Sequence, residues 1–274
     1  MMPATCDSIQ SASSLVVTTA RRPTPELERR AREWSERLGA PMVPRAGLSV
    51  ARLARDHNVA GVVVIEADRT LYVEPATDLE YFFHPNLAAV RIRNVESGKG
   101  DHMIEAMGLQ RGDHVLDCTL GRAADAIICA WRVGEEGRVV GIEKVPVIAY
   151  LTAEGLRSGQ FAGKRFTRIM RRVEALCADY NEYLPTCPDK SFDVVYFDPI
   201  FHEPVRQSKN MESLRALADA AIPGPEALRQ ALRVARRCVV IKQRRGTPLW
   251  EQLGIREIYG GKHARVEYGV VRPV

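Results

Sequence analysis

The sequence predicts an α/β protein with a mostly parallel, doubly wound, Rossmann-like sheet and a small N-terminal α/β domain. Two observations predict the sheet. From residue 96 onward, short apolar segments alternate with segments of helical period, and the chain ends in two strand-like segments suited to an antiparallel hairpin. A third observation predicts the small domain, because the first 95 residues contain strands and helices of their own. The chain has 274 residues, 46% of them hydrophobic, which is enough for two cores.

The small domain is expected over residues 14–95. It follows a polar stretch, residues 1–13, that has no apolar period and is expected to be disordered. Its clearest helix carries apolar side chains on one face, at Leu27, Ala31, Trp34 and Leu38. The elements expected in chain order are a strand over 15–19, helices over 26–38 and 50–56, and a hairpin of strands 62–66 and 71–73.

The large domain is expected over residues 96–274, and its strands and helices alternate as βαβ units do. Helices are expected over 102–107, 123–133, 146–158 and 225–236. Strands are expected over 114–118, 138–143, 173–177, 192–197 and 238–242, followed by the closing hairpin of 255–259 and 264–271. A parallel sheet closed by an antiparallel pair is typical of the methyltransferase variant of the Rossmann architecture.

The composition narrows the class of protein. No apolar run approaches the roughly 20 residues of a membrane helix, and the first 13 residues lack the pattern of a secretory leader. The six cysteines form no CxxC pair, so we expect reduced thiols in a cytoplasmic protein and no metal site. The net charge of +5 is compatible with a polyanionic partner.

Acidic residues follow four consecutive strands of the expected sheet. They are Asp117, Glu143, Asp179 and Asp198. Ligands of open α/β sheets bind beyond the carboxyl ends of the strands, so we expect these side chains to line one ligand site.

The residue types at this edge favour S-adenosylmethionine (SAM) over a dinucleotide. A pyrophosphate needs a glycine-rich turn, whereas the first turn here has Gly121 alone and a carboxylate, Asp117. SAM carries a cationic sulfonium and an ammonium group, which acids attract. Glu143 is expected to accept both ribose hydroxyls, Asp179 to reach the adenine amine, and Tyr180 to lie beside the ring.

The segment Asp198-Pro199-Ile200-Phe201 is similar to the (Asp/Asn)-Pro-Pro-(Tyr/Phe) motif of amino-group methyltransferases. An exocyclic base amine is a poor nucleophile, because its lone pair is conjugated into the ring. A carboxylate and a backbone carbonyl that accept its two N–H groups would align the nitrogen with the methyl group. We therefore expect Asp198, Pro199 and Phe201 to be catalytic, with Phe201 stacking on the base.

Polar and basic residues near this motif are expected to bind the substrate. They are Lys99, His202, Arg206, Ser208 and Lys209. His202 could also relay the proton that the amine loses. The densest basic cluster is Lys164, Arg165, Arg168, Arg171 and Arg172, which we expect to contact RNA beside the site.

These motifs resemble class I SAM-dependent methyltransferases, and more narrowly the bacterial family that methylates guanine N2 in small-subunit ribosomal RNA. The similar stretches lie within residues 95–271, at 97–101, 117–126, 143–147, 194–201 and 239–242. The resemblance implies that SAM contacts Ala124, Asp125, Glu143, Lys144, Asp179, Tyr180 and Asp198. With the first-turn residues Asp117, Thr119 and Gly121, these form the expected cofactor site.

The sequence departs from the family pattern at three places, one of which is the lysine-rich stretch beyond the amine motif, reduced here to Arg206, Lys209 and Arg215. The first turn reads Gly121-Arg122-Ala123-Ala124-Asp125 where the family has Gly-Leu-Gly-Arg-Asp, and His202 stands where the family has proline.

From the motifs and the resemblance together, we expect a cytoplasmic SAM-dependent N-methyltransferase that acts on guanine N2 of ribosomal RNA, alone or in a small-subunit particle. Another RNA, a protein or a small molecule is the alternative substrate. A nucleotide-dependent oxidoreductase and a non-catalytic RNA-binding protein are the alternative classes.

Overall fold

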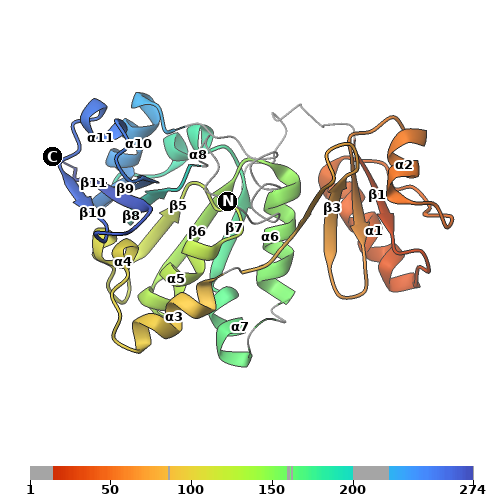
Figure 1. Ribbon diagram of the computed structural model, residues 1–274, viewed down its shortest axis with the longest axis horizontal. Helices are drawn as coiled ribbons and strands as arrows, with labels where there is room; N and C mark the ends of the chain where they lie inside the picture. Colours follow the sequence, from red (N-terminus) through yellow and green to blue (C-terminus); the bar gives the residue numbers. More distant parts are fainter. Residues whose placement is uncertain (1–14, 86, 159–160, 162, 200–221, 274) are drawn as a thin grey trace. The chain divides into compact units, whose positions relative to one another are not determined.

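The computed structural model describes residues 15–85, 87–158, 161, 163–199 and 222–273 (Figure 1). These residues form two compact units, a small unit that ends at Phe83 and a large unit that begins at His84. The stretch 1–13, expected to be disordered, lies outside the described residues.

The small unit is an α/β module with one four-stranded sheet in the order β1-β2-β3-β4. Its elements are β1 (Leu15–Thr19), α1 (Pro25–Leu38), α2 (Val50–Asp56), β2 (Gly61–Ile65), β3 (Thr70–Glu74) and β4 (Leu79–Phe82). Strands β1 and β2 are parallel, and β2, β3 and β4 form an antiparallel meander. The sequence analysis predicted this module but not β4.

Helix α1 shows why the sequence folds this way. Its N-cap Thr24 accepts a hydrogen bond from the Leu27 amide, and Gly39 ends the helix in a left-handed conformation with φ of +61°. The apolar face predicted from the sequence is buried at Leu27, Ala31 and Trp34. A separate core cluster joins β1 and β2 to Leu53 and Ala54 of α2.

The large unit contains a seven-stranded sheet in the order β10-β11-β9-β8-β5-β6-β7. Its strands are β5 (His114–Asp117), β6 (Arg138–Glu143), β7 (Val173–Cys177), β8 (Phe192–Phe197), β9 (Ala235–Arg244), β10 (Glu257–Tyr259) and β11 (Val266–Val271). Strands β5 to β9 are parallel, and β11 is antiparallel to both of its neighbours. This confirms the Rossmann-like sheet and its closing antiparallel pair.

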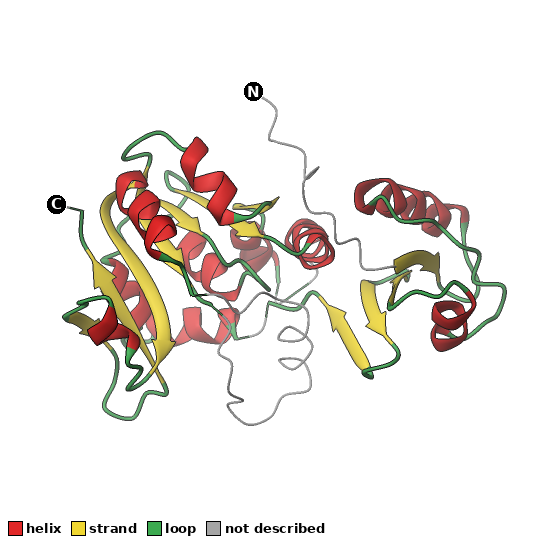
Figure 2. Ribbon diagram, turned by 90° about the horizontal axis from the view of Figure 1, so that it is seen from above, coloured by secondary structure: helices red, strands yellow, loops and turns green. Residues whose placement is uncertain are grey.

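Helices cover both faces of this sheet (Figure 2). They are α3 (Ala88–Glu96), α4 (His102–Met107), α5 (Ala124–Val133), α6 (Pro146–Ser158), α7 (Lys164–Met170), α8 (Tyr180–Thr186), α10 (Pro225–Val234) and α11 (Leu249–Gln252). Leu184 of α8 and Ala231 of α10 belong to the core cluster on one face. On the other face, Tyr196 of β8 reaches α5 with its hydroxyl group.

Most expected boundaries differ from the observed ones by a few residues, and two of the differences affect how the large unit is built. The helix expected to reach residue 236 ends at Val234, and β9 begins at once. Arg236 pairs there with Asp193 of the neighbouring strand β8, and Arg237 pairs with Asp113, which directly precedes β5. The division between units falls after Phe83, rather than after residue 95, because α3 buries Ala88 and Ile92 and packs on α5 of the large unit.

Candidate functional site

The four acids that follow the parallel strands lie in a row along one edge of the large sheet. Asp117 and Glu143 are the last residues of β5 and β6, Asp198 follows β8, and Asp179 lies two residues after β7. Across the sheet their order is Asp198, Asp117, Glu143, Asp179, because the strand order is β8-β5-β6-β7. With strands about 4.8 Å apart, the row spans roughly 14 Å. The predicted placement of these residues at one edge is confirmed.

Hydrogen bonds tie the two loops at the point where the strand order reverses. The Thr119 amide donates to Asp117 Oδ1 at 3.0 Å, and the Asp198 amide donates to Thr119 Oγ1 at 2.6 Å. Strands β5 and β8 flank this switch point, where ligands of open α/β sheets bind. Thr119 therefore fixes the Asp198 backbone relative to the first turn.

Glu143 anchors the first turn from the neighbouring strand. The Gly121 amide donates to Glu143 Oε2 at 3.1 Å, and the Val145 amide donates to Oε1 at 2.9 Å. The side chain is buried, and burial raises the pKa of this carboxyl while the backbone N–H groups oppose the rise. Each carboxylate oxygen keeps acceptor capacity, so a ribose hydroxyl could still bind.

Asp179 has partners on both of its oxygens. It caps α8 by accepting the Asn181 amide at 2.8 Å, and its Oδ2 lies 3.1 Å from Lys144 Nζ. Tyr180 packs edge-on against Phe197, with 5.3 Å between the ring centroids. Lys144, Asp179 and Tyr180 thus lie together at one end of the acidic row, and their contacts with adenine remain a prediction.

Helix α5 begins at the centre of the row, with Ala124 and Asp125 in its first turn. The preceding Ala123 adopts a left-handed conformation with φ of +58° and provides no side-chain cap. This is where the related family has glycine, the residue that adopts such a conformation without strain.

Asp125 is the centre of an ion-pair chain that the sequence analysis missed. The chain runs through Asp101, Arg91, Asp125, Lys242 and Asp198. Arg91 of α3 lies 2.9 Å from Asp101 and also pairs with Asp125, and Lys242 Nζ lies 3.0 Å from Asp125 and 2.7 Å from Asp198. Three carboxylates and two cations leave a net charge of minus one.

The charges in this chain set each other's pKa values. Burial alone would raise the pKa of Asp125, but Lys242 and Arg91 hold it well below its usual range. Burial likewise raises the pKa of Asp198, and Lys242 opposes the rise. The pKa of Lys242 lies well above its usual range, because Asp125 and Asp198 outweigh its burial. Lys242 is therefore a permanent cation beside Asp198.

The pKa of Asp117 is shifted in the opposite direction to that of Asp125. Asp117 is not a member of the ion-pair chain and pairs with no cation there. Burial raises its pKa to about 8, the Thr119 amide opposes this, and the charges of Asp125 and Asp198 add to the rise. The Asp117 carboxyl is therefore mostly protonated at neutral pH.

The members that sequence reasoning missed are distant along the chain. Arg91 and Asp125 are 34 residues apart, and Asp125 and Lys242 are 117 apart. The available signals were a lysine at the end of an apolar segment, Val239-Val240-Ile241-Lys242, and an arginine among the apolar residues of α3. Each is a charge in a buried surrounding, which requires a partner.

Of the other residues predicted for catalysis and substrate binding, the structure describes Pro199 and Lys99. Pro199 is buried directly after Asp198, and Lys99 is exposed in the loop before α4. Phe201, His202, Arg206, Ser208 and Lys209 lie outside the described residues.

The basic cluster is not beside the site, contrary to the expectation. Arg168 lies on α7, and Arg171 and Arg172 directly precede β7, so they lie at the amino edge of the parallel sheet. The acidic row lies at the carboxyl edge. Arg172 also donates to the Ala130 carbonyl at 2.6 Å, and Arg165 pairs with Glu96. These bonds give two members of the cluster a structural role.

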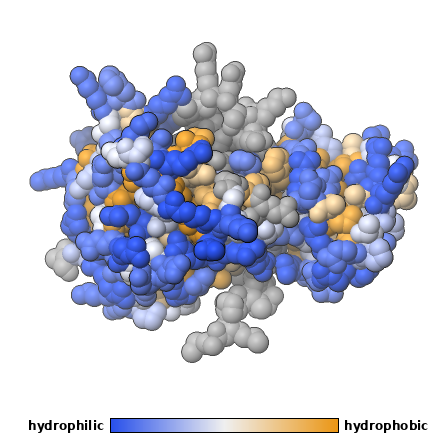
Figure 3. Space-filling model, turned by 90° about the horizontal axis from the view of Figure 1, so that it is seen from below, coloured by the Kyte–Doolittle hydropathy of each residue, from blue (hydrophilic) through white to orange (hydrophobic). Residues whose placement is uncertain are grey.

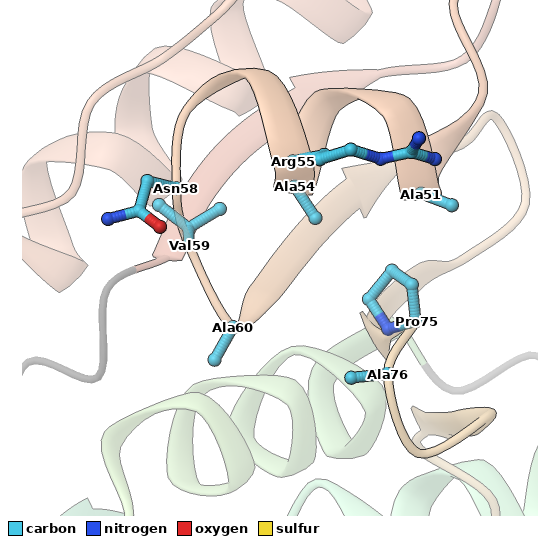
Figure 4. A pocket seen from close by; sticks show the side chains of 8 residues that line it. All are labelled: Ala51, Ala54, Arg55, Asn58, Val59, Ala60, Pro75 and Ala76. Atoms are coloured by element: carbon cyan, nitrogen blue, oxygen red, sulfur yellow. The ribbon is translucent and has the colours of Figure 1, made fainter.

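A hollow of about 610 Å³ lies in the small unit, and none of the candidate site residues that the structure describes lines it. Its lining is Ala51, Ala54, Arg55, Asn58, Val59, Ala60, Pro75 and Ala76 (Figure 4). The side chains of Arg55 and Asn58 point away from each other, and the rest of the lining is aliphatic. The hollow therefore offers no convergent set of polar groups.

Every helix among the described residues is too short or too polar to span a bilayer. No cluster of three or more His, Cys, Asp or Glu side chains in this part of the chain could hold a metal ion. The face seen in Figure 3 is mostly hydrophilic.

Comparisons with known proteins agree with this geometry. A family model described as "Putative SAM-dependent methyltransferase" matches residues 71–268, more than half of the chain. The uncharacterized protein YpiP of Bacillus subtilis is 37% identical over 257 residues, which cover 94% of this chain and 99% of that protein.

Relatives with assigned functions are also similar. The Ribosomal RNA small subunit methyltransferase J of Coxiella burnetii is 33% identical over 64% of this chain and 68% of its own length. The protein of the same name from Pseudomonas aeruginosa is 29% identical over 81% of this chain and 82% of its own length. A crystal structure of a SAM-dependent methyltransferase from Neisseria gonorrhoeae covers 94% of this chain and 96% of its own, with a TM-score of 0.65 and 17% identity. That similarity shows the fold.

Proposed function

The chain belongs to the SAM-dependent methyltransferase family, and on this premise we propose that it methylates an exocyclic amine of an RNA base, guanine N2 of ribosomal RNA. One observation carries the proposal: the Asp198-Pro199 step follows β8 at the switch point, and the Asp198 carboxylate is paired with Lys242 at 2.7 Å. Family membership also decides between a methyltransferase and the nucleotide-dependent oxidoreductase considered above.

The donor set at the carboxyl edge fits SAM. The sulfonium and ammonium groups of SAM are cationic. They suit the row of acidic side chains and the neighbouring ion-pair chain, whose net charge is minus one. When bound, SAM supplies an electrophilic methyl group on its sulfonium. Glu143 would hold the ribose hydroxyls, and Asp179 and Tyr180 would hold the adenine end. The remaining polar groups would come from Asp117, Thr119, Gly121, Ala124, Asp125 and Lys144.

Asp198 would align the amine that receives the methyl group. Lys242 favours the ionised form of the Asp198 carboxylate, which would accept an N–H bond from the base. The Pro199 ring restricts the backbone that would present a carbonyl for the second N–H. Burial raises the pKa of Asp198, which suits a group that takes up the proton lost by the methylated nitrogen. The Thr119 bond to the Asp198 amide holds this geometry.

RNA is the proposed substrate for two reasons. Relatives over most of the chain are named ribosomal RNA small subunit methyltransferases, and the motifs at 117–126 and 194–201 resemble the family that acts on guanine N2. Phe201 is proposed to stack on the base, and Lys99, His202, Arg206, Ser208 and Lys209 to contact the RNA. A cytoplasmic location belongs to the same proposal.

The test is mass analysis of nucleosides from small-subunit ribosomal RNA of a deletion strain. We expect one methylguanosine to disappear, to return with the intact gene, and to remain absent with Asp198→Ala. An unchanged set of methylguanosines would contradict the RNA substrate, and loss of a methyl group from another base would contradict guanine N2.

A further inference from the structure

Arg45 in the small unit is a buried side chain that forms no ion pair with a described residue. It is 9% exposed, and its Nε donates to the Leu48 carbonyl at 2.7 Å. No carboxylate of the described residues pairs with it, unlike Arg29 and Arg52 of the same unit, which form ion pairs with acids one turn away. None of its nitrogens is both buried and without a hydrogen bond. The end of the guanidinium therefore reaches the surface.

The backbone places Arg45 at the carboxyl edge of the parallel strands of the small unit. The Val43 amide donates to the Val17 carbonyl, and the Val17 amide donates to the Pro41 carbonyl, so segment 41–43 runs parallel to β1. Strand β2 is parallel to β1 on the other side, with Thr19 opposite Ile65. Arg21 and Arg45 both follow the ends of these parallel segments, at the edge where ligands of α/β sheets bind.

Like charges face each other at this edge. Burial lowers the pKa of Arg45, and the charge of Arg21 lowers it further, against the opposing charge of Glu66. Glu66 is already paired with Arg69 at 3.0 Å. Arg21 and Arg22 are exposed, and neither forms an ion pair with a described residue. The two guanidinium groups repel each other, the charge of Glu66 offsets this only in part, and a bound anion would add to that compensation.

We propose that Arg45 and Arg21 form a phosphate-binding site that holds the backbone of the RNA substrate on the small unit. A guanidinium donates two parallel N–H bonds to one phosphate, and burial fixes the orientation of Arg45 before the RNA arrives. The ligand is a phosphodiester group, which carries a charge in every sequence context. The site deepens the proposed function and depends on it for the identity of the ligand.

The test is the salt dependence of RNA binding by the full chain, measured by fluorescence anisotropy with a ribosomal RNA fragment. Arg21→Gln and Arg45→Gln should each lower the slope of log K against log salt by about 0.7 to 0.9, so the affinity lost between 50 and 200 mM salt becomes about threefold smaller. Arg37→Gln is the matched control. Arg37 is exposed and forms no ion pair with a described residue. It lies in the last turn of α1, about 18 Å along the helix from its first residue, Pro25, whereas Arg21 precedes the helix.

The outcomes separate this site from the proposed function. Arg21 is exposed, so Arg21→Gln decides the question even if Arg45→Gln fails to fold; equal slopes for Arg21→Gln and Arg37→Gln would overturn the site. Failure of the intact protein to bind RNA would instead overturn the proposed substrate. If inorganic phosphate alone raises the unfolding temperature of the intact protein but not of Arg21→Gln, while the RNA slopes are equal, the site takes free phosphate and the RNA proposal is wrong.

Discussion

The ionisation of Asp198 depends on Lys242, so Lys242→Met should change the pH dependence of methyl transfer. Lys242 lowers the pKa of Asp198 against the effect of burial. Without it the pKa rises, and the ionised carboxylate is present only at higher pH. The acid limb of the rate profile should therefore move to higher pH, which labelled-methyl transfer between pH 5 and 9 would measure.

Lys242→Arg is the control for this change, because it keeps the cation and should keep the limb near its original pH. Removing a buried partner of two carboxylates should also destabilise the fold by about 3 kcal/mol, as measured by chemical denaturation. A profile that is the same in Lys242→Met and the intact protein would mean that Lys242 does not govern Asp198.

Asp117 should release a proton when SAM binds. Its pKa of about 8 means that the free protein carries the proton at pH 7. A bound cation favours the carboxylate, so its pKa falls, and affinity should rise with pH up to about 8 and then level off. Calorimetry in buffers of different ionisation enthalpy should show about one more proton released per SAM than for Asp117→Asn. Equal release by the two proteins would refute this assignment.

The acids of the site could be predicted from the sequence, and their partners could not. A strand end is visible as an apolar segment followed by a polar residue, so Asp117, Glu143 and Asp198 could be placed at one edge. The pairing of Lys242 with Asp198 arises because β9 lies beside β8 in the sheet, and spacing along the chain does not show this. The edge at which the basic cluster lies follows from a strand that was predicted, because Arg171 and Arg172 directly precede the segment expected over 173–177.

Strand β6 and the first turn are packed so closely that a side chain at Gly141 would separate them. A Cβ atom there would lie 2.2 Å from Leu120 Cδ1, and the Leu120 amide donates to the Ile142 carbonyl at 2.9 Å. Gly141→Ala should therefore destabilise the protein by about 1–3 kcal/mol and weaken SAM binding, because it displaces the turn. Thermal unfolding and calorimetry measure the two effects.

Gly224→Ala is the matched control, because no atom lies within 4 Å of its Cβ position and its φ of −68° suits alanine. Its unfolding temperature should stay close to that of the intact protein. If Gly141→Ala also leaves both stability and SAM affinity unchanged, the close packing of β6 and the turn is not required.

Elements with strong local signals were predicted, and elements without them were not. The expected helices 50–56, 102–107 and 146–158 match α2, α4 and α6. Helix α8 was missed because it contains Pro185, and α3 and α7 lack a side-chain cap. Strand β4 has four residues and is stabilised by its pairing with β3. Tertiary contacts rather than local preference stabilise such elements.

The division of the molecule after Phe83 predicts which fragment folds. A fragment of residues 84–274 should fold and bind SAM as the intact chain does, because it keeps α3 and therefore Arg91, the partner of Asp101 and Asp125. A fragment of residues 97–274 lacks α3 and leaves those two acids without their guanidinium, so it should be less stable. Circular dichroism melting and SAM calorimetry would compare them. Equal stability of the two fragments would place the division at residue 95 instead.

The two-part plan and the parallel sheet could be read from the sequence because alternation of apolar strands and helices extends over the whole of 96–274. The exact position of the division between the two units could not be read from the sequence. Helix α3 has little local signal, and it belongs to the large unit only through its packing on α5 and its ion pairs.

Transfer of a labelled methyl group from SAM to under-methylated small-subunit ribosomal RNA by the purified protein tests the central claim most directly. The intact protein should label guanine N2, and Asp198→Ala should be slower by about 10²–10³-fold. The variant should stay folded and still bind SAM, because Lys242 keeps Asp125 as a partner at 3.0 Å. Near-normal turnover by a folded Asp198→Ala protein, or no transfer to RNA by the intact protein, would contradict the assignment of Asp198 as the group that aligns an RNA base amine.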